Sequence, residues 1–158
     1  SAHLVLAGND LGGLDEARRR VAAHGLGARV HETGLLTGTD RLDALADADL
    51  VVYAGGDEVF GLVACEALLA GTPAIVADDS GCAEIVGKVG GGLVVPPGDA
   101  AALARALRRV LEHASAWRGR ALDAGREVRR LFNTTRVSAD LEAIYTSVLG
   151  TSLDRRTA

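Results

Sequence analysis

The fold of this 158-residue chain is decided by residues 50–77, which read LVVYAGGDEVFGLVACEALLAGTPAIVA. The apolar run Leu50–Ala54, rich in β-branched residues, predicts a strand. Leu62–Ala70 predicts a helix that Gly71 ends just before a second strand, Pro73–Ala77. A strand, a helix and a strand in this order, with strands that are apolar throughout, predict a parallel sheet covered on both faces.

The same alternation of strands and helices continues on both sides of this stretch. Further strands are expected at residues 3–7, 28–31 and 92–95, and further helices at residues 16–23 and 40–48. Asp99 is expected to cap a long helix, and two more helices follow, the last with Val137, Leu141, Ile144, Tyr145 and Val148 on one stripe. The chain is therefore expected to form one doubly wound, Rossmann-like α/β domain over residues 1–149, followed by a polar tail over residues 150–158. In such folds ligands bind at the carboxyl ends of the strands.

Composition excludes several classes of function. Lys and Arg number 17 against 21 Asp and Glu, and this net charge of −4 argues against a general nucleic-acid binder. No apolar run approaches the ~20 residues of a membrane span. The four histidines show no metal-ligand spacing, so no metal site is expected. Cys65 and Cys82 are interpreted as reduced core residues of a cytoplasmic protein.

The loop before the central helix has the features of an anion site. A strand that enters a helix through a glycine-bearing loop points backbone N–H groups and the positive end of the helix dipole at the carboxyl edge of the sheet. Gly61 leaves room for a ligand to approach the backbone. A phosphate or a diphosphate is the expected occupant.

Two carboxylates accompany this loop. Glu66 is the one charged residue between Leu62 and Ala70, about one helical turn from the helix start at ~1.5 Å per residue. That position suits a carboxylate that binds the hydroxyls of a ribose whose phosphate lies at the helix start. Alternatively, Glu66 pairs with an arginine at a helix–helix contact. Glu58, in the loop, is by itself most simply a solvated or capping residue.

Glu58 and Glu66, with seven residues between them, resemble the E-x7-E signature of retaining GT-B glycosyltransferases, in particular family 4, the glycosyltransferase group 1 domain. Phe60-Gly61-Leu62-Val63 lies between the two glutamates, as in that signature. The resemblance spans roughly residues 4–148 and includes Thr33–Leu35, Leu45–Val52, Gly81–Val86 and Gly92–Asp99.

This resemblance implies a site for a nucleotide-sugar donor in the C-terminal half of a GT-B fold. Glu66 would bind the ribose hydroxyls, and the amides of Gly61 and Leu62 would hold the diphosphate. Phe60 is placed with these donor-binding residues. Glu58 would contact hydroxyls of the transferred sugar and is the expected catalytic residue.

The resemblance also implies the remaining contacts and the chemistry. The Gly34–Leu35 backbone would meet the base of the donor. Family members transfer a hexose from a nucleoside-diphosphate sugar to a glycan, lipid or small-molecule acceptor, with retention and without a bound metal or other cofactor.

The sequence departs from the family pattern in two respects. The family domain begins one βα unit earlier, with an Arg and a Lys that clamp the diphosphate, and its acceptor site lies in an N-terminal domain. The chain is thus expected to lack its first βα unit and to be inactive alone, with any membrane association arising from the missing half. Cys82 stands where a second glycine is more usual, at a place where the family backbone approaches the sugar.

Two other functions are compatible with the same residues. The chain could be a nucleotide-binding module without chemistry of its own, or part of a nucleotide-sugar epimerase of the same architecture. A dinucleotide site at Gly8–Gly13 is a weaker reading, because this loop lacks the G-x-G-x-x-G spacing.

Overall fold

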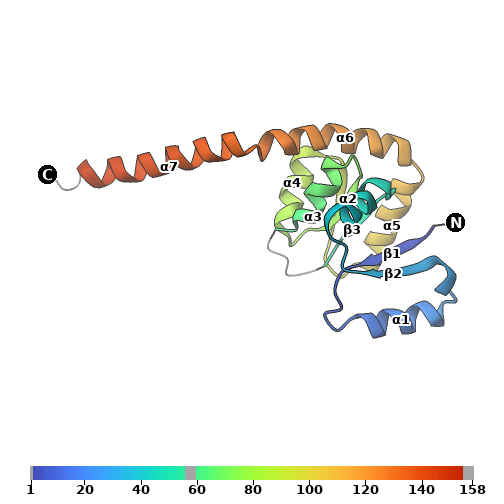
Figure 1. Cartoon of the computed structure of the whole chain (residues 1–158). Coiled ribbons are helices and arrows are strands. Elements are labelled where there is room, and N and C mark those ends of the chain that lie inside the picture. The colour runs from blue at the N-terminus through green and yellow to red at the C-terminus, as the bar shows by residue number, and fades with distance from the viewer. Residues whose placement is uncertain (1, 56–59, 155–158) are drawn as a thin grey trace. The chain divides into compact units, whose positions relative to one another are not determined.

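The structure is a computed structural model that describes residues 2–55 and 60–154. The chain divides into two compact units, with the boundary between Ala44 and Leu45 (Figure 1). Each unit is α/β and contains only parallel strand pairs. The α/β class and the parallel pairing predicted from the sequence are confirmed.

The first unit contains a two-stranded parallel sheet. Strand β1 (Leu4–Ala7) pairs with β2 (Val30–Gly34), and helix α1 (Leu14–Ala23) connects them. The predicted strand at residues 28–31 begins later than expected, because a 3₁₀ turn occupies Gly27–Arg29. Neither strand has a buried residue. Helix α2 (Gly38–Asp47) follows and crosses the boundary between the units.

The second unit is built on the sheet β3-β4-β5, with all strands parallel. Its strands are β3 (Val51–Tyr53), β4 (Ala74–Ala77) and β5 (Gly92–Val95). Its remaining helices are α3 (Leu62–Leu69), α4 (Gly81–Val89), α5 (Ala100–Leu111), α6 (Ala114–Leu131) and α7 (Thr134–Asp154). Every residue of β4, the central strand, is buried.

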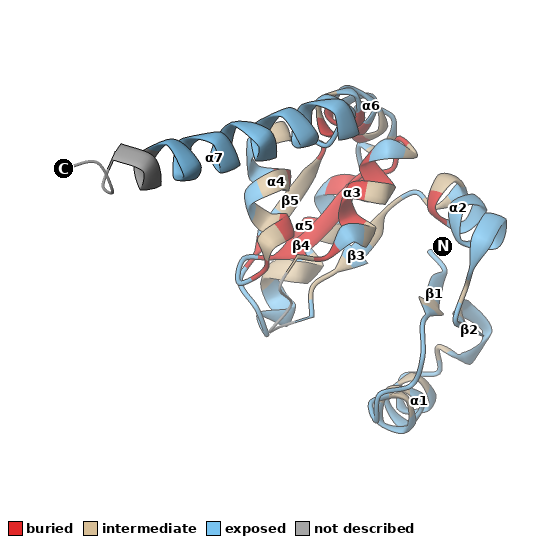
Figure 2. Ribbon diagram, turned by 60° about the vertical axis from the view of Figure 1, so that its left-hand side comes forward, coloured by how far each residue is buried: buried red, intermediate tan, exposed pale blue. Residues whose placement is uncertain are grey.

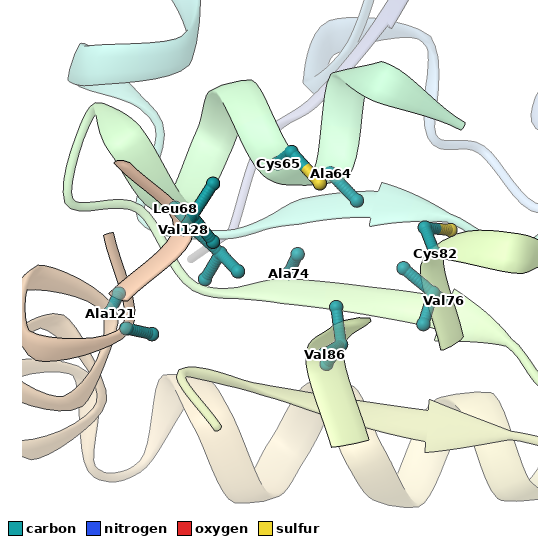
Figure 3. Packing of buried hydrophobic residues seen from close by; sticks show 10 residues of the cluster. Ala64, Cys65, Leu68, Ala74, Val76, Cys82, Val86, Ala121 and Val128 are labelled. Atoms are coloured by element: carbon teal, nitrogen blue, oxygen red, sulfur yellow. The ribbon is translucent and has the colours of Figure 1, made fainter. Parts of the chain in front are cut away.

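Helices cover both faces of this sheet, as the apolar strands predicted (Figure 2). One core cluster joins β4 to α3, α4 and α6 and contains Ala64, Leu68, Val76, Val86, Ala121 and Val128 (Figure 3). A second cluster joins β4 and β5 to α5 and the start of α6, and contains Ile75, Val95, Ala106, Val110 and Trp117. Successive residues of β4 alternate between the two clusters, as side chains of a strand do.

Two helices differ from the sequence pattern. Helix α4 was not predicted, because Gly81 and Gly87 lie within it and glycine is a poor helix former; its buried residues Cys82 and Val86 anchor it to the core. Helix α7 continues through Gly150 to Asp154, so the predicted polar tail begins as helix. Among the described residues, no helix combines the length and the apolarity of a membrane span.

The predicted cap of α5 is present and can be tested. The Asp99 side chain accepts a hydrogen bond from the Ala102 amide at 2.8 Å. Asp99→Ala should lower the free energy of unfolding by about 1 kcal/mol, since an amide at the helix start loses its partner. Urea unfolding followed by the fluorescence of Trp117, the one tryptophan, measures this loss. Asp99→Asn is the control and should be nearly neutral; a loss as large as that of alanine would contradict the capping role.

Candidate functional site

Three helices of the second unit begin where the parallel strands end, at the carboxyl edge of the sheet. Helices α3, α4 and α5 follow β3, β4 and β5 respectively. Asp99 caps α5, whereas the N-cap residues of α3 and α4, Gly61 and Ser80, make no side-chain cap bond. The two uncapped helix starts direct backbone N–H groups and positive dipole ends toward this edge, which favours an anion there.

Gly61 forms the turn that begins α3. Its backbone is left-handed, with φ of 70° and ψ of 59°, and its carbonyl accepts from the Ala64 amide at 3.1 Å. A β-carbon on Gly61 would lie 2.8 Å from Tyr53 Cε1 and 2.9 Å from Cys82 Sγ. Gly61 is therefore required both by the turn and by the close packing of β3 and α4 against it.

Glu66 lies one turn further along α3, about 6 Å along the axis from Leu62. It shares the outer face of the helix with Leu62 and Leu69, which are 65% and 41% exposed. The opposite face is buried and consists of Ala64, Cys65, Ala67 and Leu68. Glu66 itself is half-buried, so its carboxylate can reach a ligand while the rest of α3 packs in the core.

Phe60 has a clear structural contact. Its half-buried side chain packs against the core cluster of α3, α4 and α6, and its ring meets that of Phe132 edge-on, with 6.1 Å between centroids. Glu58, the expected catalytic residue, lies outside the described residues.

Gly34 and Leu35, the residues expected to meet the base, belong to the first unit. Gly34 ends β2 with φ of +67°, and its carbonyl accepts from the Gly8 amide at 2.9 Å. Leu35 is 61% exposed. The structure thus brings Phe60, Gly61, Leu62 and Glu66 together at α3 and places the other two in a separate unit.

The loop after β1, considered above as a dinucleotide site, is organised by Asp10. Its carboxylate accepts from the Gly12 amide at 2.7 Å and from the Leu14 amide at 3.2 Å. These two bonds lower the pKa of Asp10 below its ordinary value. A carboxylate already takes the amides at the start of α1, which speaks against a phosphate there.

The sequence pattern missed the side chains that pack around Gly61. Ser80 precedes α4 at the capping position, a signal that the sequence does contain, but its hydroxyl bonds to the Ala77 carbonyl at 2.6 Å instead of to the helix. Cys82 is completely buried, so its side chain points into the core and not to the surface where a sugar would approach. The contact of Tyr53 with Gly61 has no local signal, because it joins a strand to the helix start after an intervening loop.

The site offers amides and a carboxylate, and the thiol of Cys65 is a weak nucleophile. Burial raises the pKa of the Cys65 thiol, and the neighbouring Cys82 and Glu66 act in the same direction. A thiol with a raised pKa is a poor nucleophile at neutral pH. Within residues 2–55 and 60–154, no group of three His, Cys, Asp or Glu side chains is placed to hold a metal ion. The arrangement is suited to binding a phosphate group together with hydroxyl groups.

Comparison with known proteins finds a matching family model and related sequences. The model of the family described as "Glycosyl transferases group 1" matches residues 1–127. A phosphatidyl-myo-inositol mannosyltransferase of Mycobacterium leprae is 32% identical over 135 residues, which are 85% of this chain and 36% of that protein. The chain therefore spans about a third of the length of this relative.

Solved structures also resemble the chain over most of its length. Sucrose-phosphate synthase from Thermosynechococcus elongatus matches with a TM-score of 0.75 and 29% identity, over 94% of this chain and 39% of that one. Anabaena Alr3699/HepE, solved in complex with UDP and glucose, matches with a TM-score of 0.80 and 25% identity, over 92% of this chain and 40% of that one.

Proposed function

Because the chain belongs to the group 1 glycosyl transferases, we propose that it is the donor-binding domain of a retaining, metal-independent glycosyltransferase. The donor is a nucleoside-diphosphate hexose, and the acceptor is a glycan, a lipid or a small molecule. The observation that carries the proposal is the pair of helix starts at one sheet edge whose N-cap residues, Gly61 and Ser80, make no side-chain cap bond, with the Glu66 carboxylate one turn along α3.

The diphosphate binds at the start of α3. The left-handed turn at Gly61 presents the amides of Gly61 and Leu62 to the diphosphate. These donors stabilise the negative charge that grows on the diphosphate as the bond to the sugar breaks. Local amides supply this stabilisation, so the net charge of −4 is no obstacle.

The other groups of the donor have proposed contacts of their own. Glu66 accepts hydrogen bonds from the ribose hydroxyls, which lie on the nucleoside side of the diphosphate. Glu58 contacts hydroxyls of the transferred sugar, and the Gly34–Leu35 backbone meets the base. Phe60 packs against Phe132 and so supports the turn. Its role in donor binding is therefore indirect.

Other proteins of the comparison support the donor class. The Anabaena protein was solved with UDP and glucose, and the name of the Mycobacterium leprae relative gives it as a mannosyltransferase. These proteins differ in sugar, so we propose a nucleoside-diphosphate hexose and no particular base. Two buried, unbridged cysteines support a reducing, cytoplasmic location.

Glu66→Ala tests the ribose contact. The variant should weaken binding of a nucleoside diphosphate by about 1–3 kcal/mol, the size of a lost hydrogen bond to a charged group. The affinities of the 158-residue chain for UDP, GDP and ADP are measured by titration calorimetry or ligand-observed NMR. EDTA is present throughout, because the proposed site needs no metal.

The control is Glu112→Ala. It removes an exposed carboxylate at the C-terminal end of α5, whereas the N-terminal end of that helix lies at the carboxyl edge of the sheet. It should leave the affinity unchanged. If Glu66 serves only as an ion-pair partner between helices, Glu66→Ala lowers stability and keeps the affinity, which contradicts the ribose role. Failure of all three nucleotides to bind the unaltered chain contradicts the donor-site proposal.

A further inference from the structure

The start of α3 is packed against two side chains that are distant in sequence. Tyr53, the last residue of β3, and Cys82, in the first turn of α4, both lie where a β-carbon on Gly61 would be. The Cys82 side chain is completely buried, and it belongs to the core cluster shown in Figure 3. The left-handed turn of Gly61 thus packs directly against a strand end and a second helix start.

The thiol of Cys82 has a defined hydrogen-bond direction. Its Sγ lies 3.1 Å from Ser80 Oγ, and the Ser80 hydroxyl donates to the Ala77 carbonyl at 2.6 Å. A hydroxyl has one proton to donate. Because Ser80 gives its proton to Ala77, the Cys82 thiol must donate to Ser80. The last residue of β4 is thereby linked through Ser80 and Cys82 to the turn at Gly61.

From this linkage we infer that Cys82 is a positioning residue of the donor site: it sets the Gly61 turn so that the amides at the start of α3 point at the diphosphate. The inference rests on the proposed function and adds a residue to it. It also gives a role to a cysteine that stands where the family more usually has glycine, since the side chain is buried in the core.

Cys82→Ala tests the positioning role. Without the sulfur atom the turn loses one of its two lateral contacts, and its amides no longer keep their direction. The affinity for UDP, GDP or ADP should fall about tenfold, the size of one hydrogen bond to a charged group. The affinity for the corresponding monophosphates, which carry one phosphate fewer, should fall less than about threefold. Cys82→Ser keeps a donor to Ser80 and should restore most of the preference for the diphosphate.

Cys65→Ala is the matched control, because Cys65 is the other buried thiol of the same core cluster. It creates a similar cavity on α3 and should destabilise the fold without changing the preference for diphosphate over monophosphate. If Cys82→Ala changes that preference no more than Cys65→Ala does, the inference is wrong while the donor site stands. If the unaltered chain binds no nucleoside diphosphate, the proposed function fails and the inference fails with it.

A measurement on the unaltered chain keeps the test independent of the folding of the variants. Cys82 is completely buried against Gly61, so N-ethylmaleimide reaches it only when the structure around it opens, and a diphosphate bound to the Gly61 turn should hold this region closed. Saturating nucleoside diphosphate is expected to slow the alkylation of Cys82 at least about fivefold more than that of Cys65, with both sites quantified by mass spectrometry. Equal slowing at both thiols, or at neither, would overturn the positioning role.

Discussion

Gly125→Ala should lower the free energy of unfolding by about 3 kcal/mol, because the added methyl group overpacks a helix contact. Gly125 lies in α6 where that helix crosses α3, and a β-carbon there would collide with the carbonyl oxygen of Leu68 and come within 3.3 Å of Leu69 Cα. These atoms are backbone, so no side-chain rotation relieves the clash. The Leu68 carbonyl also accepts from the Gly71 amide at 3.0 Å, so the end of α3 would be disturbed.

Gly119→Ala is the matched control in the same helix. Gly119 is exposed, and a β-carbon there would have no atom within 4 Å. Alanine is a better helix former than glycine by about 1 kcal/mol, so this change should stabilise the protein. Chemical denaturation followed by Trp117 fluorescence measures both variants. Two shifts of the same sign would mean that α3 and α6 do not approach each other at Gly125 as described.

Gly61→Ala is expected to lower both stability and donor binding. A left-handed backbone costs an alanine about 1–2 kcal/mol, and the overlap with Tyr53 and Cys82 adds about 1–3 kcal/mol. Relief of this strain should rotate the turn and remove the amides from the diphosphate. We expect unfolding at a lower denaturant concentration, together with loss of measurable UDP, GDP or ADP binding at a temperature where the variant is folded.

Gly98→Ala measures the cost of backbone strain without the cost of steric overlap. Gly98 has φ of +73°, close to the value at Gly61, but a β-carbon there would have no atom within 4 Å. This variant should lose about 1–2 kcal/mol from the backbone alone and should bind nucleotide normally. If it lost as much stability as Gly61→Ala, the packing of Tyr53 and Cys82 on Gly61 would be without consequence.

The elements that the sequence predicted well are those with local signals. The helix from Leu62 is apolar and ends at Gly71, and Asp99 has the side chain that a helix start requires, so both were readable from neighbouring residues. The strand at 92–95 was predicted at its observed bounds. Helix α4 lacked such a signal, because its two glycines oppose helix formation and only its burial in the core compensates for them.

Part of the candidate site was also readable from local signals in the sequence. The sequence alone identified the loop and helix with Gly61, Leu62 and Glu66, since a glycine before a helix and a single carboxylate in an apolar run are patterns of adjacent residues. The roles proposed for these residues stay predictions until the binding experiments are done. Glu58, on which the E-x7-E spacing depends, lies outside the described residues.

By itself, then, the sequence determined the α/β class, the alternation of strands and helices except for α4, and the helix start with its carboxylate, because backbone preference and apolar periodicity act over a few residues. Only the tertiary structure decided what surrounds that helix start: the Tyr53 ring and the Cys82 thiol packed against Gly61, and the Ser80 hydroxyl that bonds to Ala77 and contacts Cys82. Most of these contacts join separate strands and helices, and they form only when the packing of the core brings those elements together.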